Sequence, residues 1–493
     1  MSRYVLAVDQ STQGTKGLLF DERGVLVCRA DRPHRQIVND RGWVEHDPVE
    51  ILENTVKVCG DVMEKTHVSS ADVAAFGISN QRETSLMWDK ATGRPVYNAI
   101  VWQCARAAEI CGRAEVESKA EAIRRKTGLP LSPYFPAAKL CWLMEHVPEA
   151  APLAGREQLA CGTVDSWLVY KLTGNHKTDY SNASRTQLFN IVELKWDEEL
   201  CRLFSIPLSS LPEVCMSDSV FGMTDLCGVL DHKIPVCGVL GDSHGALFGQ
   251  DCRRPGRIKA TYGTGSSVMM NIGGQPRFSE NGLVTSLAWG MNGKVEYVFE
   301  GNLNYTGAVM TWLKHDVGLI ATDMEASELA AAANPNDRAY FVPAFTGLGA
   351  PYWDSAATGM FTGITRTTGR KELVKACLDC IAYQIADLTK LMGEEAGVPV
   401  SDLRVDGGPT ASGYLMQLQS DLSNATVQIP DLQELSGMGA AYAAGIAAGL
   451  YDPETVYDHV RRTQYTPVMT AERRKSLYTG WKNAVAQTLG KGR

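Results

Sequence analysis

An aspartate follows an apolar, strand-like run at the very start of the chain. Asp9 comes directly after Tyr4–Val8 and opens the polar turn Asp9–Lys16, which contains hydroxyl groups, a glycine and a lysine. The carboxylate could hold Mg²⁺, and the hydroxyls and backbone N–H groups of the turn could face phosphate oxygens. The turn matches neither a Walker A loop nor a dinucleotide-binding glycine motif. By itself it fits an ordinary polar hairpin equally well.

A second carboxylate, Asp242, follows the apolar run Val236–Leu240 and has a glycine on each side, at Gly241 and Gly245. Transfer of a phosphoryl group to a hydroxyl needs a base or orienting group that is separate from the carboxylate holding the metal. Asp242 could fill that role. An aspartate that caps the start of a helix would give the same local pattern.

Two further turns are rich in glycine. Thr261–Ser267 carries a Gly-Thr-Gly turn between two strand-like runs, and Gly407 and Gly408 follow the strand-like run Leu403–Val405. Glycine lets a backbone approach a phosphate closely, so that its N–H groups can donate to it. Each turn alone is also compatible with a plain connection between elements. Together with Asp9–Lys16 they favour a phosphate group clamped from both sides.

Arg82 and Glu83 lie side by side after the strand-like run Ala75–Ser79. An arginine donates in a fork and a glutamate accepts, which suits recognition of neighbouring hydroxyl groups. A surface ion pair is the commoner use of such residues. Three aromatic side chains could add apolar walls, although packing in the core is the commoner role for each of them: Trp88, Trp102 and Tyr134.

The elements that would position these residues form a pattern that occurs twice. Tyr4–Phe20 predicts a strand, a polar turn and a strand, and Ile258–Ile272 repeats this order about half a chain later. Strands alternate with helices in both halves, which indicates α/β architecture. We therefore expect two related lobes, with the boundary near residue 251. Helical periodicity is strong in three segments: Val49–Thr66, Glu372–Met392 and Gly413–Leu422.

Composition restricts the class of protein. A formal net charge of −8 over 493 residues argues against nucleic acid or an anionic membrane as the main partner. No secretion signal is visible, and 13 scattered cysteines, an odd number, indicate reduced thiols in the cytoplasm. Cys377 and Cys380 share a predicted helical face with apolar residues, so we expect core packing rather than a metal site.

These motifs together resemble the FGGY family of carbohydrate kinases, most closely its glycerol-phosphorylating members. Tyr134–His146 and Gly359–Asp379 are similar to two signatures of that family, and similar stretches follow in order over essentially the whole chain. The resemblance implies two actin-like (ribonuclease H-like) domains with a cleft between them. Residues 1–250 would bind the substrate and residues 251–493 would bind ATP.

The resemblance also implies roles for single residues. Asp242 would be the general base, and Asp9 would organise Mg²⁺. The ATP-binding residues would be Thr12, Gln13, Lys16, Gly263, Thr264, Gly307, Thr311, Gly408 and Ser412. The substrate-binding residues would be Arg82, Glu83, Trp102, Tyr134, Asp242, Ser243 and Ser267. A polyol or sugar and ATP would be the small-molecule partners, and a homodimer or a homotetramer stays open.

Two of the positions that depart from the glycerol-phosphorylating members would, by the resemblance, contact glycerol. Ser243 stands where they usually have glutamine, and Ser267 where they usually have phenylalanine. We expect ATP-dependent phosphorylation of glycerol or a similar small polyol. A longer acceptor such as erythritol or xylulose stays an alternative, because two small hydroxyl side chains leave room and hydrogen-bonding capacity. An ATP-binding sensor without catalysis would share the fold, but the intact Asp9 and Asp242 argue against it.

Overall fold

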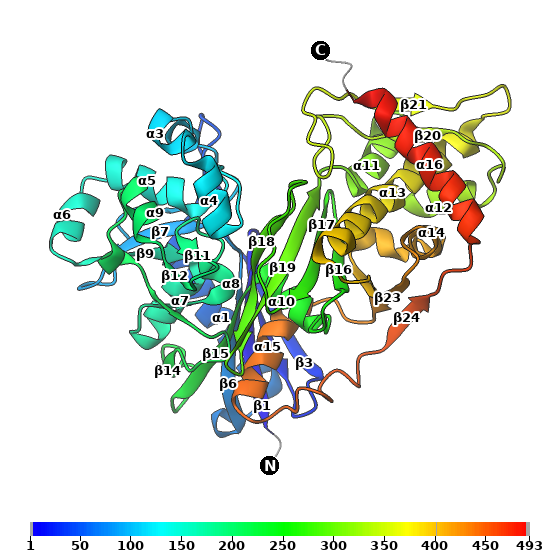
Figure 1. Cartoon of the computed structure of the whole chain (residues 1–493). Helices are drawn as coiled ribbons and strands as arrows, with labels where there is room; N and C mark the ends of the chain where they lie inside the picture. The colour runs from blue at the N-terminus through cyan, green and yellow to red at the C-terminus, as the bar shows by residue number, and fades with distance from the viewer. Residues whose placement is uncertain (1–2, 401, 490–493) are drawn as a thin grey trace.

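The computed structural model describes residues 3–400 and 402–489. The chain folds into two lobes that lie side by side, each built on a mixed sheet (Figure 1). The N-terminal lobe also carries the side sheet and small helices on the left of the view, and the C-terminal helix α16, Ala471–Thr488, lies across the outside of the other lobe. Within residues 3–400 and 402–489, no helix has both the length and the apolarity that crossing a membrane requires.

The first sheet has six strands. In spatial order they are β14 Gly222–Thr224, β15 Ile234–Gly241, β6 Val73–Asn80, β1 Tyr4–Gln10, β2 Gly14–Phe20 and β3 Leu26–Pro33. β15, β6 and β1 run parallel to one another, whereas β2 returns antiparallel to β1. The central strand β1 is buried along nearly its whole length, which explains its almost unbroken apolar sequence.

The second sheet has seven strands and repeats this plan. In spatial order they are β18 Val284–Met291, β19 Lys294–Leu303, β17 Ser266–Gly273, β16 Arg257–Tyr262, β22 Asp402–Asp406, β23 Thr426–Pro430 and β24 Arg462–Tyr465. The hairpin β16–β17 corresponds to β1–β2, and β22 lies parallel to β16 as β6 does to β1. The predicted two-lobed α/β fold is therefore confirmed.

A side sheet extends the first lobe, and local sequence did not predict it as a separate layer. Its strands, in spatial order, are β4 Ile37–Val38, β5 Val44–His46, β8 Ala99–Ile100, β7 Ser85–Asp89 and β9 Leu159–Thr163. Helices of this lobe include α1 Pro48–Thr66, α4 Ala120–Thr127, α5 Pro136–His146 and α7 Val164–Thr173. Several of these strands have two or three residues, too few for a period-2 pattern to be visible.

Two helices pack closely between the sheets. α10, Asp242–Gly249, and α15, Leu435–Ala447, approach so tightly that a Cβ at Gly439 would lie 1.8 Å from the carbonyl oxygen of Gly245. α15 comes from the second half of the chain but also packs against β1, β6 and β15 of the first sheet. The last part of the chain therefore returns to the first lobe, and the two halves share this face.

The second lobe is built around a long buried helix. α13, Arg370–Ala396, packs against α12 Asp323–Ala331 and α14 Gly413–Ser423. Cys377 and Cys380 are fully buried on it and are free thiols, as their helical spacing predicts. The carboxylate of Asp387 on α13 accepts from Trp481 Nε1 at 2.7 Å, which fixes α16 to the core.

Candidate active site

Three parallel strands of the first sheet end at the same edge, and each carries a predicted site residue there. Asp9 is the penultimate residue of β1, Arg82 follows β6, and Asp242 follows β15. The register pairs Asp9 with Ser79 on β6, and Gly241 with Asn80. Ligands in open α/β sheets bind outside the carboxyl ends of such strands. The sheet topology therefore brings together residues that lie up to 233 positions apart in the chain.

Asp9 is a buried carboxylate that keeps one oxygen available. Its Oδ1 accepts from Ser79 Oγ at 2.9 Å. Burial raises the pKa of Asp9 to about 6, because the charged form loses its hydration; Lys16 opposes this, while Asp242 and Glu434 add to it. A nearby cation would therefore favour the ionised form.

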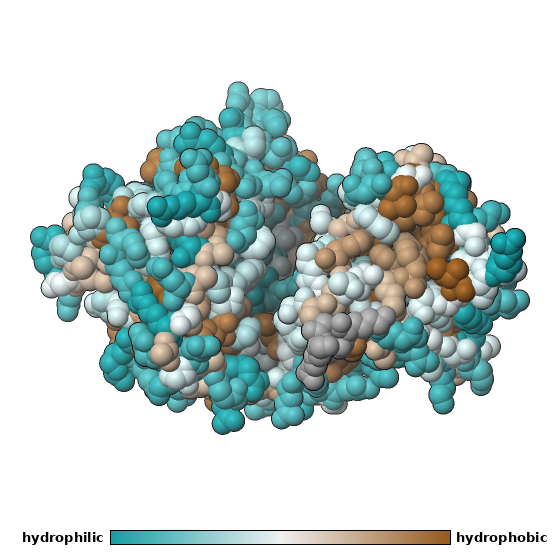
Figure 2. Space-filling view, turned by 90° about the horizontal axis from the view of Figure 1, so that it is seen from above, coloured by the Kyte–Doolittle hydropathy of each residue, from teal (hydrophilic) through white to brown (hydrophobic). Residues whose placement is uncertain are grey.

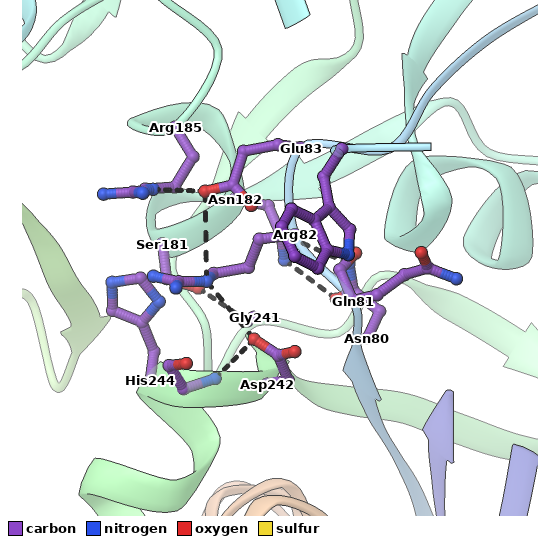
Figure 3. A network of polar contacts seen from close by, with 12 residues as sticks. Asn80, Gln81, Arg82, Glu83, Ser181, Asn182, Arg185, Gly241, Asp242 and His244 are labelled. Atoms are coloured by element: carbon purple, nitrogen blue, oxygen red, sulfur yellow. Dashed lines mark hydrogen bonds and ion pairs between the residues drawn. The ribbon is translucent and has the colours of Figure 1, made fainter. Parts of the chain in front are cut away.

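Asp242 is the first residue of α10 and remains partly open to the cleft. Its Oδ1 accepts from the backbone N–H of Ser243 at 2.6 Å, and Arg82 Nε lies 3.2 Å from the same oxygen. Figure 3 shows Arg82 extended between Glu83 and Asp242. The side chain of Asp242 is 35% exposed, so it can meet a ligand while Arg82 fixes its orientation.

Arg82 and Glu83 do not form an isolated surface pair. Both terminal nitrogens of Arg82 donate to Glu300 on β19, at 3.1 and 3.0 Å. Arg185 donates its Nε to Glu83 Oε1 at 2.6 Å and lies with Nη1 2.9 Å from Glu300 Oε2. Burial alone would raise the pKa of Glu300, but Arg185 and Arg82 outweigh it and hold that pKa well below its usual range.

Sequence reasoning missed both Arg185 and Glu300. The one signal for Glu300 is a glutamate inside the otherwise apolar stretch Tyr297–Gly301, where a charge needs a partner. Arg185 lies in a polar segment with no local pattern of its own. Both are almost fully buried.

The predicted aromatic residues separate into two groups. Trp102 and Tyr134 lie together at the site, with ring centroids 5.5 Å apart, and both are half-buried. Trp88 is fully buried against Trp167 and belongs to the core. Trp102 Nε1 also donates to Thr12 Oγ1 at 2.9 Å, which links this aromatic pair to the turn after β1.

A cleft of about 240 Å³ lies between the lobes at this edge. Viewed from above, Figure 2 shows a deep groove between the two halves of the molecule. The cleft is lined from the first lobe by Asp9, Lys16, Asp242 and Ser243, and from the second by Lys259, Thr261, Ser267 and Asp406. The buried Oγ of Ser267 has no hydrogen-bond partner within the described part of the chain.

A larger pocket of about 560 Å³ lies in the second lobe. It brings together six of the nine residues predicted to bind ATP: Gly263, Thr264, Gly307, Thr311, Gly408 and Ser412. Gly307 N–H donates to Gly263 O at 2.9 Å, so two glycines hold the turn after β16 against the start of α11, Gly307–His315. Sequence reasoning missed the apolar side chains that line it: Met310, Met324 and Leu378.

The other three predicted ATP residues lie outside this pocket. Thr12 and Gln13 are on the turn between β1 and β2, and Lys16 is on β2. Gln13 is exposed. Lys16 lines the interlobe cleft and pairs with Glu434 at 2.8 Å.

The carboxylates suit a metal that arrives with a ligand. Among residues 3–400 and 402–489, no group of three or more His, Cys, Asp or Glu side chains could hold a metal ion by itself. Asp9 offers a buried carboxylate whose ionised form a cation would stabilise. That donor set fits Mg²⁺, which keeps several waters and binds through one or two carboxylates and phosphate oxygens.

Comparisons with known proteins agree with this arrangement. Residues 4–249 match the N-terminal domain, and residues 258–448 the C-terminal domain, of the FGGY family of carbohydrate kinases. The chain is 45% identical to glycerol kinase 2 of Thermotoga maritima and 43% identical to glycerol kinase of Caldanaerobacter subterraneus subsp. tengcongensis, with 99% of each chain covered.

Solved structures of carbohydrate kinases are similar to this chain over its whole length. Plasmodium falciparum glycerol kinase with ADP superposes with a TM-score of 0.93 at 34% identity, over 99% of this chain and 98% of that one. Xylulose kinase from Lactobacillus acidophilus has a TM-score of 0.86 at 24% identity, over 99% of both chains, which shows a shared fold.

Proposed function

The chain belongs to the FGGY family of carbohydrate kinases, and on that premise we propose that it transfers the γ-phosphoryl group of ATP to a hydroxyl group of glycerol. The observation that carries the proposal is the position of Asp242. Its carboxylate faces the interlobe cleft, is oriented by Arg82, and stands apart from the metal carboxylate Asp9. Full-length relatives at 43–45% identity that are named glycerol kinases support glycerol as the acceptor.

In the proposed reaction Asp242 accepts the proton of the acceptor hydroxyl as its oxygen attacks the γ-phosphorus. The bond between that phosphorus and the β–γ bridging oxygen breaks, and ADP leaves with the electron pair. The remaining task of the protein is positioning and charge stabilisation, because phosphoryl transfer needs little covalent chemistry from the enzyme.

Asp9 would hold Mg²⁺, which when bound neutralises charge on the β- and γ-phosphate oxygens. Lys16 and the hydroxyl and backbone groups of the turn after β1 would face the same phosphates. The position of Lys16 beside Asp9 in the cleft supports this assignment. Glu434 holds Lys16 there, so its ammonium group is already oriented before the nucleotide arrives.

The nucleotide base and ribose would occupy the larger pocket of the second lobe. The apolar side chains of Met310, Met324 and Leu378 suit the faces of an adenine ring, and Gly263 and Gly307 allow close backbone approach. We therefore assign acceptor binding to residues 1–250 and nucleotide binding to residues 251–493.

Arg82 and Glu83 would bind hydroxyls of glycerol, with Trp102 and Tyr134 beside its carbon chain. A second acceptor class, a four- or five-carbon polyol or ketose, has one observation in its favour. Among the residues that the structure describes, the buried Ser267 Oγ has no hydrogen-bond partner, and Ser243 lines the same cleft. A longer acceptor could hydrogen-bond both hydroxyls, which glycerol would leave unmatched.

A coupled assay of ADP release over acceptors of three to six carbons tests the proposal. We expect glycerol to be phosphorylated with a turnover of roughly 1–100 per second, the usual range of kinases. A higher kcat/KM for a longer acceptor would favour the second class. Absence of ADP release with every acceptor would reject both.

A further inference from the structure

Glu300 is a buried charged side chain on β19, the strand next to the edge of the second sheet. It pairs in register with Met269 on β17 and Val284 on β18. Only 2% of it is exposed. A carboxylate in such surroundings needs cationic partners. The cations that contact Glu300 come from the first lobe, whereas Glu300 itself belongs to the second.

Both oxygens of Glu300 are held by arginines of the first lobe. Arg82 donates Nη1 to Oε2 at 3.1 Å and Nη2 to Oε1 at 3.0 Å, a bidentate pair. Arg185 Nη1 lies 2.9 Å from Oε2. A fork held at two nitrogens has a fixed plane and a fixed direction.

The contacts continue to the other acceptor-binding residue and close a ring. Arg185 Nε donates to Glu83 Oε1 at 2.6 Å, and that oxygen lies 4.0 Å from Arg82 Nε. The ring alternates two cations and two anions, and none of the four side chains is more than 7% exposed. Figure 3 shows three of its members, Arg185, Glu83 and Arg82, leading to Asp242.

Three members of the ring lie on the acceptor side, and one comes from the nucleotide side. Arg82, Glu83 and Arg185 belong to segments of the first lobe, and Glu300 is 218 residues away from Arg82 in the chain. Without Glu300, two buried guanidinium groups would share Glu83 and Asp242. Arg82 would then lose the two hydrogen bonds that set its plane.

We propose that Glu300 is a positioning residue for the acceptor site: from the nucleotide lobe it holds Arg82 directly, and Glu83 through Arg185, in the geometry that binds acceptor hydroxyls beside Asp242. This inference rests on the proposed function, since it assigns Arg82 and Glu83 to the acceptor. It makes acceptor binding depend on docking of the two lobes at β19.

The test compares Glu300→Gln and Glu300→Asp with the matched control Glu296→Gln. Glu296 lies on the same strand and accepts from Asn271 Nδ2 at 2.6 Å. In the described part of the chain it forms no hydrogen bond or ion pair with the four side chains of the ring. For each variant the KM for the acceptor, the KM for ATP and kcat are measured, with the acceptor that the wild type uses best. Circular dichroism and Tm verify the fold.

We expect Glu300→Gln to raise the acceptor KM at least tenfold and to lower kcat at least tenfold, with the KM for ATP within threefold of wild type. Glu300→Asp, which keeps the charge, should recover part of both losses and covers the case in which the glutamine variant does not fold. Glu296→Gln should stay within twofold in all three constants. The inference would be overturned if folded Glu300 variants kept the wild-type acceptor KM and kcat. It would also be overturned if their KM for ATP rose as much as their KM for the acceptor.

A double-mutant cycle with Arg82→Lys tests whether Glu300 acts through Arg82. The double variant should be little worse than Arg82→Lys alone, because the residue that Glu300 positions is already impaired. If the fold losses in kcat/KM of the two single variants multiply in the double variant, Glu300 does not act through Arg82. A wild type without activity on any acceptor would overturn the proposed function, whereas an active wild type with unaffected Glu300 variants would overturn this inference alone.

Discussion

The Nε atom of Arg82 lies 3.2 Å from Oδ1 of Asp242, so the residue proposed to bind the acceptor also orients the proposed base. The two residues reach this position from the ends of neighbouring parallel strands, β6 and β15. An acceptor hydroxyl held by Arg82 would therefore lie beside the carboxylate that removes its proton. The contact between Arg82 and Asp242 therefore serves both acceptor binding and catalysis in the proposed reaction.

Asp242→Asn should fold and bind nucleotide but lose most of its turnover. The amide keeps the size of the side chain and removes the proton acceptor, which typically costs about 10²–10⁴-fold. Steady-state kinetics, together with ADP binding by calorimetry, measures both properties. A purified Asp242→Asn protein with near wild-type kcat would defeat the assignment of the base.

Asp9→Asn should mainly impair the use of Mg²⁺. The substitution removes one negative charge from the proposed metal site, so more free Mg²⁺ is needed to fill it. We expect the curve of kcat against free Mg²⁺ to shift to higher concentration, with part of the rate recovered at saturation. A Mg²⁺ dependence identical to that of the wild type would reject the role of Asp9.

The same substitution should stabilise the metal-free protein in a pH-dependent way. Burial raises the pKa of Asp9 from 3.8 to about 6, so the folded state holds this proton more tightly than the unfolded state. Wild-type stability is therefore lost as pH rises from about 4 to 6, by up to about 3 kcal/mol. Asp9→Asn does not titrate and should escape that loss.

Thermal unfolding without Mg²⁺ between pH 5 and 8 measures this effect. The Tm of Asp9→Asn should exceed that of the wild type at pH 7 to 8, and the difference should shrink toward pH 5. The exposed Asp40→Asn serves as the control for the loss of one charge. A Tm difference that does not change with pH would show that burial of Asp9 is not its cause.

Gly307→Ala should weaken nucleotide binding without affecting the acceptor. An added Cβ would lie 2.5 Å from the carbonyl oxygen of Gly263, so the turn after β16 must move. Overpacking of this kind costs about 1–3 kcal/mol, and we expect the KM for ATP to rise about tenfold or more. Gly155→Ala, where a Cβ meets open space, is the control. An unchanged KM for ATP would remove Gly307 from the nucleotide site.

The double variant Ser243→Gln with Ser267→Phe tests the size of the acceptor site. Larger side chains fill the cleft and remove the Ser267 hydroxyl, which has no hydrogen-bond partner among residues 3–400 and 402–489. We expect the ratio of kcat/KM for glycerol to that for four- and five-carbon acceptors to rise relative to the wild type. A double variant that only loses activity, with this ratio unchanged, would show that the two serines do not set acceptor length.

The elements around Asp9 and Asp242 could be predicted from the sequence because each aspartate follows an apolar run long enough to identify a buried strand. The repeated strand–turn–strand pattern also predicted the two sheets. The glycine turns predicted three residues that line the pocket of the second lobe, Gly263, Thr264 and Gly408, since a turn has a local sequence signature. The other three, Gly307, Thr311 and Ser412, followed only from the family resemblance.

Glu300 could not be assigned in the same way. Its partners, Arg82 and Arg185, lie in the other half of the chain, and only the docking of the lobes brings them together. Lys16 and its partner Glu434 are separated by 418 residues for the same reason. Strand register and lobe packing are long-range properties, which local periodicity does not contain.

The most direct test of the account is glycerol-dependent ADP release by the purified wild type in the presence of Mg²⁺, with the product identified by ³¹P nuclear magnetic resonance. We expect ADP and a glycerol monophosphate in equal amounts, with both signals lost in Asp242→Asn. ATP binding without any acceptor-dependent ADP release, over glycerol and all longer polyols and ketoses, would contradict it and would favour a nucleotide-binding protein without phosphotransfer.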